Sequence, residues 1–272
     1  MIIFPKAKIN LGLRITKKRP DGFHDIETIF YPIDLSDALE FTDSLEETQR
    51  DRLTVTGTET GCMPDDNLVM MALRKLRERF TFPFLKIHLH KANPSGAGLG
   101  GGSSDAAFLL KSIDRHYNLQ AGNSVLNTLA LELGSDCPFF MEALPSHATG
   151  RGEILNPVSP LLSGLYIVLL NPGVGINTGE AYRNCKPSEP EESLLLHYNR
   201  PAEEWRGLIF NDFEAFAFEK HPVIGEIKNR LYDCGALFSS MSGSGSSVFG
   251  IFHLKPSLPP ELKDYVIFHG PL

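Results

Sequence analysis

Hydrophobic and polar positions alternate along the first part of the chain in a way that predicts β-strands. Between Lys8 and Thr16, four apolar residues alternate with polar or small ones. This period of two indicates a strand with one buried face. Further strands are predicted from runs of β-branched and apolar residues; they are expected at residues 24–35, 38–42, 52–57, 85–90, 165–170 and 248–252.

Apolar residues recur at helical spacing in several segments between and after these strands. Helices are predicted at about 66–80, 104–117, 124–133, 178–184, 203–219 and 222–233. Antiparallel strand patterns combined with grouped helices favour an α+β fold over a doubly wound sheet. A turn-rich segment, His147–Glu153, suggests a boundary near residue 150. We therefore predict two domains, 1–150 and 151–272.

Composition and charge narrow the possible partners. The chain has 272 residues and a formal net charge of −7, which argues against a nucleic-acid partner. No apolar run approaches 18 residues, so we expect no membrane association. The first residues enter strand-like sequence directly, which predicts no signal peptide. Four scattered cysteines without a CxxC pair, and His88 and His90 without further ligands, give no zinc or disulfide signature. We expect a cytoplasmic protein.

The most informative segment is Pro94–Asp105, which contains five glycines and two serines within Gly96–Ser104. A helical pattern follows at once, and Ser103 or Ser104 is a candidate N-cap. The unpaired N–H groups of the first turn and the positive end of the helix dipole would then face the glycines. Glycine lets backbone amides approach a charged oxygen closely, so the segment predicts a phosphate-binding loop. A flexible linker is less favoured because it would not lead directly into a helix.

Two common phosphate-binding motifs do not fit this loop. A P-loop requires lysine directly after the glycines, but the next lysine is Lys111, inside the predicted helix. The dinucleotide-binding fingerprint requires glycines directly after a strand and an acidic residue about 20 residues later. Here Pro94–Ala97 separates the strand from the glycine run, and the acidic residue is absent from that window.

Three separated segments together resemble the signature motifs of the GHMP kinases, the superfamily of galactose, homoserine, mevalonate and phosphomevalonate kinases. They are Pro5–Asn10, the loop at 94–105, and Met241–Ser246. An Asp-Gly-Phe-His element at 21–24 resembles an element found in one branch of this superfamily. The kinases of that branch act on a cytidine diphosphate derivative of methylerythritol in non-mevalonate isoprenoid biosynthesis. The resemblance runs from about residue 5 to 252; its marks are the segments 7–11, 19–24, 94–107, 134–140 and 171–174.

The resemblance implies a two-domain fold with the active site in the cleft between the domains. It also implies transfer of the ATP γ-phosphoryl group to a hydroxyl of the methylerythritol moiety, with Mg²⁺. Lys8 and Asp136 match the family's catalytic pair. A carboxylate can orient the hydroxyl and take its proton, while an ammonium can stabilise charge on the phosphoryl oxygens. Asn10 lies two residues after Lys8, on the same face of a strand, and could hydrogen-bond the substrate hydroxyl or Asp136.

The resemblance also implies which residues bind the two substrates. Phe23 and Tyr182 match positions that stack on cytosine, His24 matches a position that hydrogen-bonds the base, and Thr178 lies near Tyr182. Asn67 matches a position that helps to hold adenine, and Ser103 or Ser104 could contact Mg²⁺. The predicted ATP-binding residues are Asn67, Pro94, Ser95, Gly96, Ala97, Gly98, Leu99, Gly100, Gly101, Gly102, Ser103 and Ser104.

Two other functions remain open from the sequence. One is a different small-molecule GHMP kinase, such as a homoserine or mevalonate kinase; the Asp-Gly-Phe-His element argues against it. The other is a nucleotide-binding sensor without catalysis. Such a protein could keep the glycine loop but would not need both Lys8 and Asp136, so their joint presence favours an enzyme.

Overall fold

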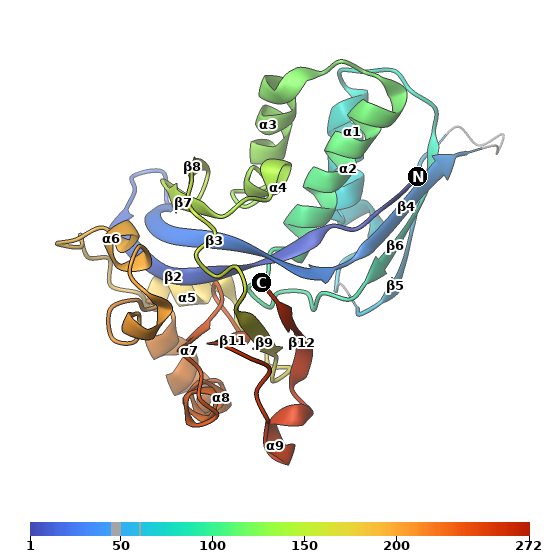
Figure 1. Ribbon diagram of the computed structural model, residues 1–272. Coiled ribbons are helices and arrows are strands. Elements are labelled where there is room, and N and C mark those ends of the chain that lie inside the picture. Colours follow the sequence, from blue (N-terminus) through green and yellow to red (C-terminus); the bar gives the residue numbers. More distant parts are fainter. Residues whose placement is uncertain (45–49, 60) are drawn as a thin grey trace. The chain divides into compact units, whose positions relative to one another are not determined.

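A computed structural model describes residues 1–44, 50–59 and 61–272 (Figure 1). Over these residues the main strands form three four-stranded sheets. The chain separates into two compact units that are interleaved in sequence. The first unit comprises residues 1–7, 35–95 and 100–143, and the second comprises 8–34, 96–99 and 144–272. The glycine-rich segment therefore contributes residues to both units.

The first unit is built on one mixed sheet and a group of helices. The sheet has the order β1-β4-β6-β5, in which β6 is antiparallel to β4 and parallel to β5. Side chains along β6 alternate between buried and exposed positions, so this strand has one packed and one solvent-facing side. The elements are β1 (Ile2–Ile3), β4 (Ala38–Asp43), β5 (Arg52–Gly57), η1 (Pro64–Asp66), α1 (Leu68–Arg77), β6 (Leu85–Lys91), α2 (Gly101–Tyr117), α3 (Gly122–Leu133) and α4 (Phe139–Glu142).

The second unit contains most of the second sheet and all of the third. The second sheet has the order β2-β3-β7-β8, and the third has the order β10-β11-β9-β12. Both are built on long-range pairing; for example, β9 pairs antiparallel with both β11 and β12. The strands are β2 (Lys6–Lys18), β3 (His24–Ser36), β7 (Ser146–Thr149), β8 (Ile154–Pro157), β9 (Tyr166–Leu170), β10 (Phe238–Met241), β11 (Val248–Phe252) and β12 (Val266–Pro271).

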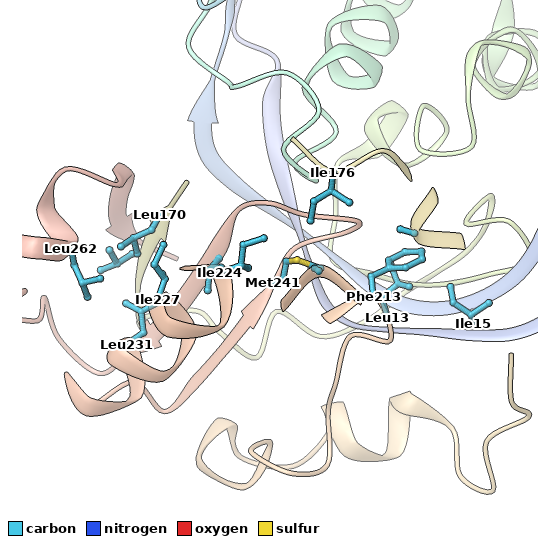
Figure 2. Close-up of a cluster of buried hydrophobic side chains, with 14 of the residues drawn as sticks. Leu13, Ile15, Leu170, Ile176, Phe213, Ile224, Ile227, Leu231, Met241 and Leu262 are labelled. Carbon is cyan, nitrogen blue, oxygen red and sulfur yellow. The ribbon is translucent and has the colours of Figure 1, made fainter. Parts of the chain in front are cut away.

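Helices of the second unit pack with its strands around one apolar cluster, shown in Figure 2. Leu13 and Ile15 from β2 join Leu170 from β9 and Phe213 in this cluster. Burial of such side chains contributes roughly 1.5–3 kcal/mol each. The helices of this unit are α5 (Thr178–Asn184), α6 (Leu194–Tyr198), η2 (Ala202–Glu204), α7 (Glu214–Lys220), α8 (Pro222–Asp233) and α9 (Pro260–Lys263).

The structure confirms the predicted α+β class and most of the predicted elements, and it corrects two of them. The helix expected at 203–219 is a short 3-10 turn, η2, followed by the separate helix α7. The serine N-cap was also wrong: α2 begins at Gly101, and its N-cap is Gly100, in the left-handed region with φ 68°. Within the described part of the chain, no helix combines the length and apolar character needed to span a membrane. The domain boundary at residue 150 stays a prediction.

Candidate active site

Residues 96–99 of the glycine loop are held by backbone and side-chain hydrogen bonds within the second unit. The Leu99 carbonyl accepts the backbone N–H of Lys8 at 3.0 Å, and the Ala97 carbonyl accepts that of Ser247 at 3.2 Å. The Gly98 carbonyl accepts the hydroxyl of Ser242 at 2.8 Å. The segments around Lys8, the glycine loop and 241–246, which are far apart in the sequence, thus lie together in space.

Gly98 is the position where the loop backbone comes closest to its neighbours. An added Cβ would lie 1.9 Å from the Ser242 carbonyl oxygen, and the residue has φ +79°. That oxygen is itself fixed, because it accepts the backbone N–H of Gly245 at 3.0 Å. Gly96 also has a positive φ, +64°, but a Cβ there would meet nothing within 4 Å. Glycine is therefore required at position 98 both by backbone conformation and by space.

Lys8 has a defined set of neighbours on the second unit. Its ammonium donates to Asn10 Oδ1 at 2.6 Å and to the Gly98 carbonyl at 3.2 Å. It also lies 5.0 Å from the centroid of the Phe30 ring, within the range of a cation–π interaction. Lys8 and Asn10 are almost fully buried, with 3% and 1% of their surfaces exposed. The structure thus holds the ammonium beside the glycine loop, and its contact with phosphoryl oxygens stays a prediction.

On the first unit, the start of α2 lies beside the turn that carries Asp136. Asp136 is half-buried in the turn between α3 and α4. The next residue, Cys137, is hydrogen-bonded through its thiol to Ser103. A Cβ on Gly134 would lie 3.9 Å from Ser103 Oγ. The structure thus brings one predicted ATP-binding serine and the turn of the predicted base together. Lys8 and Asp136 belong to different units, and their pairing stays a prediction.

The two serines near the start of α2, Ser103 and Ser104, differ in how far they are buried. Ser104 is fully buried, and its hydroxyl has no hydrogen-bond partner among the described residues. Ser103 keeps part of its surface exposed. Burial raises the pKa of the adjacent Cys137 thiol to about 12, against the opposing effect of the Ser103 hydrogen bond. Cys137 is therefore a neutral packing residue at physiological pH.

An ion cluster anchors the same end of α2 to the sheet. The ammonium of Lys91, at the end of β6, binds the carboxylates of Asp37 and Asp105. Asp37 Oδ1 also accepts the backbone N–H groups of Ala92 and Asn93, at 2.6 and 2.8 Å. Burial raises the pKa of Asp105 to about 7, and the nearby Asp37 charge adds to this effect while Lys91 opposes it. The cluster thus holds the glycine-rich segment on both sides: Asp37 binds Asn93, just before the segment, and Lys91 binds Asp105 at its end.

Asn67 caps the helix that the sequence predicted to begin at about residue 66. Its side-chain oxygen accepts the backbone N–H of Val69 at 2.9 Å and so caps α1. Capping by asparagine typically contributes about 1 kcal/mol. The start of α1 also packs near the glycine-rich turn, because a Cβ on Gly102 would lie 3.5 Å from Leu68 Cδ1. The contribution of Asn67 to adenine binding stays a prediction.

The predicted cytidine-binding residues lie together within the second unit. His24 stacks on Tyr182, with ring centroids 4.9 Å apart and an interplanar angle of 18°. Burial lowers the pKa of His24, and the charge of Lys18 adds to this. A neutral imidazole has one donor and one acceptor, which suits recognition of a base edge. Thr178, one turn before Tyr182 on α5, hydrogen-bonds the Ser244 hydroxyl at 2.8 Å.

Phe23 faces a residue that sequence reasoning missed. The Arg151 guanidinium lies 3.8 Å from the centroid of the Phe23 ring, and the Phe23 side chain is 49% exposed. Arg151 Nε is buried and has no hydrogen-bond partner within the described residues. The arrangement of Phe23 and Tyr182 on two sides of cytosine stays a prediction.

Comparison with known proteins identifies the family. The sequence matches the GHMP kinases N terminal domain over residues 67–142 and the GHMP kinases C terminal domain over residues 195–269. A 4-diphosphocytidyl-2-C-methyl-D-erythritol kinase of Bacteroides thetaiotaomicron is 49% identical over 259 residues, covering 95% of this chain and 94% of that protein. The chain belongs to this kinase family within the GHMP kinases.

Further relatives agree along nearly the whole length. A kinase of the same name from Parabacteroides distasonis is 49% identical, covering 98% of this chain and 96% of that protein. The crystal structure of a 4-(cytidine 5'-diphospho)-2C-methyl-D-erythritol kinase superposes with a TM-score of 0.76 at 32% identity, covering 92% of this chain and 90% of that one. The expected GHMP kinase fold and the assignment as a kinase are confirmed.

The structure adds two residues to the candidate site of this kinase, Arg151 and Ser242. Ser242 donates to the Gly98 carbonyl and accepts the backbone N–H of Asn10 at 3.2 Å, so it joins two motifs. Its position inside the motif 241–246 was the signal for it. The signal for Arg151 was weaker: a single basic residue between two glycines in the segment 147–153, which the sequence suggested only as a domain boundary.

Proposed function

We propose that the chain transfers the γ-phosphoryl group of ATP to a hydroxyl on the methylerythritol moiety of 4-diphosphocytidyl-2-C-methyl-D-erythritol. The observation that carries this proposal is the set of relatives bearing that enzyme's name, which match at 49% identity over nearly the entire chain. The geometry supports it, because a glycine loop and a buried lysine converge within one unit.

The glycine-rich segment fits the phosphates of ATP. Gly98 approaches the Ser242 carbonyl more closely than any side chain would allow, whereas a Cβ on Gly96 would meet nothing within 4 Å. The N-terminal amides of α2, after Gly100, have no partners within the helix. Such amides, together with the helix dipole, stabilise phosphate groups. We assign residues 94–104 to ATP binding, with Asn67 at the adenine end.

Magnesium accompanies ATP in this proposal. In the described residues, no group of three or more histidine, cysteine or acidic side chains could hold a metal ion. This fits an ion that is bound chiefly by phosphate oxygens, with few protein ligands. Between the two candidate serines, Ser103 fits better, because Ser104 is fully buried. When bound, Mg²⁺ neutralises charge on the transferring phosphoryl group.

The protein's own part in the transfer is positioning and charge stabilisation. Asp136 orients the substrate hydroxyl before transfer. It accepts the hydroxyl proton as the new P–O bond forms and the bond from the γ-phosphorus to the β–γ bridging oxygen breaks, with ADP as the leaving group. Lys8 stabilises the charge on the phosphoryl oxygens. Asn10 holds Lys8 through the 2.6 Å bond to its amide oxygen and lies on the same strand face. Because its hydrogen bonds to Asn10 and the Gly98 carbonyl already hold the Lys8 ammonium, this group needs little reorganisation during the reaction.

Cytidine recognition positions the distant hydroxyl. Phe23 and Tyr182 supply aromatic surfaces for cytosine, and neutral His24 supplies hydrogen bonds to the base edge. Arg151, held over Phe23 with its Nε unpaired within the described residues, suits the diphosphate because guanidinium binds phosphate oxygens strongly. Binding energy from this non-reacting group is then available to position the reacting hydroxyl.

A phosphorylation assay with a substrate panel tests this proposal. The purified chain is supplied with Mg-ATP and, separately, with 4-diphosphocytidyl-2-C-methyl-D-erythritol, methylerythritol phosphate, homoserine and mevalonate. We expect phosphorylation of the cytidylated substrate only. Equal turnover with and without the cytidine would refute the substrate assignment. ATP binding without phosphorylation of any of the four would instead favour a nucleotide sensor.

A further inference from the structure

A buried row of hydrogen bonds leads from Lys8 into the pair of strands β2 and β3. Lys8 Nζ donates to Asn10 Oδ1 at 2.6 Å. Asn10 Nδ2 donates to Thr28 Oγ1 at 3.0 Å. Thr28 Oγ1 donates to the Gly12 carbonyl at 2.5 Å. Asn10 and Thr28 are 1% and 0% exposed, so bulk water does not reach these groups.

The chemistry of the last acceptor fixes the direction of the whole row. The Gly12 carbonyl has no hydrogen to give, so the single hydroxyl hydrogen of Thr28 must point toward it. The Thr28 oxygen can then only accept, which requires the NH₂ group of Asn10 to face it. The oxygen of the Asn10 amide is consequently turned toward Lys8. The Lys8 ammonium, which can only donate, requires the same orientation from the other side, so Lys8 and Thr28 together anchor the amide at both ends.

We propose that Thr28 is a positioning residue for phosphoryl transfer, which acts by fixing the orientation of the Asn10 amide and thereby the position of the Lys8 ammonium. This inference rests on the proposed catalytic role of Lys8. Thr28 itself contacts neither the phosphoryl group nor the hydroxyl in this proposal. Its effect is transmitted through the charge-assisted bond between Lys8 and Asn10, the type of hydrogen bond that is strongest in proteins.

Replacing Thr28 by valine removes the hydroxyl while keeping the shape of the side chain. The Asn10 NH₂ group and the Gly12 carbonyl would both lose a partner in a buried place, which is costly. The 2.6 Å bond from Lys8 still holds the amide oxygen toward the ammonium, but the other side of the amide is no longer anchored. The amide can then tilt, and the ammonium bound to it shifts with it. We expect kcat to fall by about tenfold or more, with KM for ATP and for the cytidylated substrate changed less than about threefold.

A double-mutant cycle separates this role from simple destabilisation. The four proteins are the wild type, Thr28→Val, Asn10→Ala and the double variant, each assayed for kcat and KM with Mg-ATP and the cytidylated substrate. Because Thr28 acts through Asn10, Thr28→Val should cause no further loss of kcat once Asn10 is alanine. Thr28→Ser keeps the hydroxyl and should restore most of the activity.

A matched control is available on the same two strands. The Thr16 hydroxyl donates to the Asp25 carbonyl at 3.1 Å, so Thr16→Val removes the same kind of bond without touching Asn10. Its kcat should remain within about twofold of the wild type. Melting temperatures of all variants show that folded proteins are compared; if Thr28→Val does not fold, Thr28→Ala takes its place in the cycle.

The outcomes distinguish this inference from the proposed function. If Thr28→Val keeps kcat within twofold, or if its loss multiplies with that of Asn10→Ala, the positioning role is wrong. A change confined to KM would also overturn it. If Lys8→Ala in the same assay keeps normal turnover, the proposed role of Lys8 fails first. Loss in Lys8→Ala together with normal kcat in Thr28→Val would leave the proposed function standing and refute only the role of Thr28.

Discussion

Replacing Gly98 by alanine tests whether the close approach of the glycine loop to the turn at 242–245 controls ATP binding. The new Cβ would lie 1.9 Å from the Ser242 carbonyl oxygen and 2.8 Å from its carbon, whereas ordinary contacts begin near 3.4 Å. The two backbones must therefore separate by about 1.5 Å, the difference between 3.4 and 1.9 Å. The Ser242 oxygen cannot move alone, because it accepts the Gly245 N–H at 3.0 Å.

Two energetic contributions are expected in the Gly98→Ala variant. Its φ of +79° costs an L-residue roughly 1–2 kcal/mol. Crowding in a packed region adds typically 1–3 kcal/mol. Gly96 offers a matched control, since its φ is +64° but a Cβ there meets nothing within 4 Å. Gly96→Ala therefore carries the backbone strain without the crowding, and the difference between the variants isolates the crowding.

Calorimetric titration with ATP, combined with thermal unfolding, measures this difference. If the loop moves to relieve the crowding, Gly98→Ala should bind ATP about 5- to 150-fold more weakly than Gly96→Ala, the equivalent of roughly 1–3 kcal/mol. If the turn containing Ser242 moves instead, the same free energy appears as lower thermal stability. Equal ATP affinity and equal melting temperature in the two alanine variants would refute the reasoning.

Three further predictions concern catalysis, specificity and pH. Asp136→Asn and Lys8→Ala should each lower kcat by at least about 10²-fold while ATP still binds, and Lys8→Arg should restore little; single-turnover kinetics and ATP titrations check this, and normal turnover in a folded variant would exclude that residue. Phe23→Ala should weaken substrate binding by roughly 1–3 kcal/mol, whereas His24→Ala should mainly reduce discrimination between cytosine and uracil in competition by CDP and UDP; unchanged discrimination would remove the histidine from base recognition. Burial raises the pKa of Asp105 to about 7, so its stabilising contribution is complete below its unfolded pKa and is lost as the pH rises through about 7. As the pH rises from about 5 to about 8, the Asp105→Asn variant should therefore lose less stability than the wild type. Equal decreases in the melting temperature of the two proteins over that pH range would contradict the raised pKa.

Much of the fold could be predicted from local pattern. The strand β5 and the helices α5 and α8 lie where the sequence placed them. The apolar pattern is clearest in α8, where Ile224, Ile227 and Leu231 are buried at helical spacing. The short strands β7, β8 and β10 were missed. With four residues each, they show too few alternations to stand out. Their conformation depends on pairing with distant strands, such as Thr28 of β3 with Ala148 of β7, which the local sequence does not contain.

The candidate site was predictable where a motif carries its own chemistry. Glycines followed by a helix indicated a phosphate loop without any knowledge of the rest of the chain. Arg151 was not predictable, because its significance comes from lying 3.8 Å from the centroid of the Phe23 ring, about 130 residues earlier in the sequence. Thr28 was missed for a similar reason. Its hydroxyl matters only because β2 places the Asn10 amide and the Gly12 carbonyl on either side of it.

The two serines of the glycine motif show how an error of one helical turn changes a functional assignment. A cap at Ser103 or Ser104 would have left both hydroxyls at the end of the helix, equally able to meet a ligand. The N-cap is Gly100 instead, so both serines lie inside the first turn, where neighbouring side chains point about 100° apart. One hydroxyl consequently reaches Cys137 beside Asp136, and the other is fully buried. The preference for Ser103 over Ser104 as the proposed magnesium ligand therefore follows from where the helix begins.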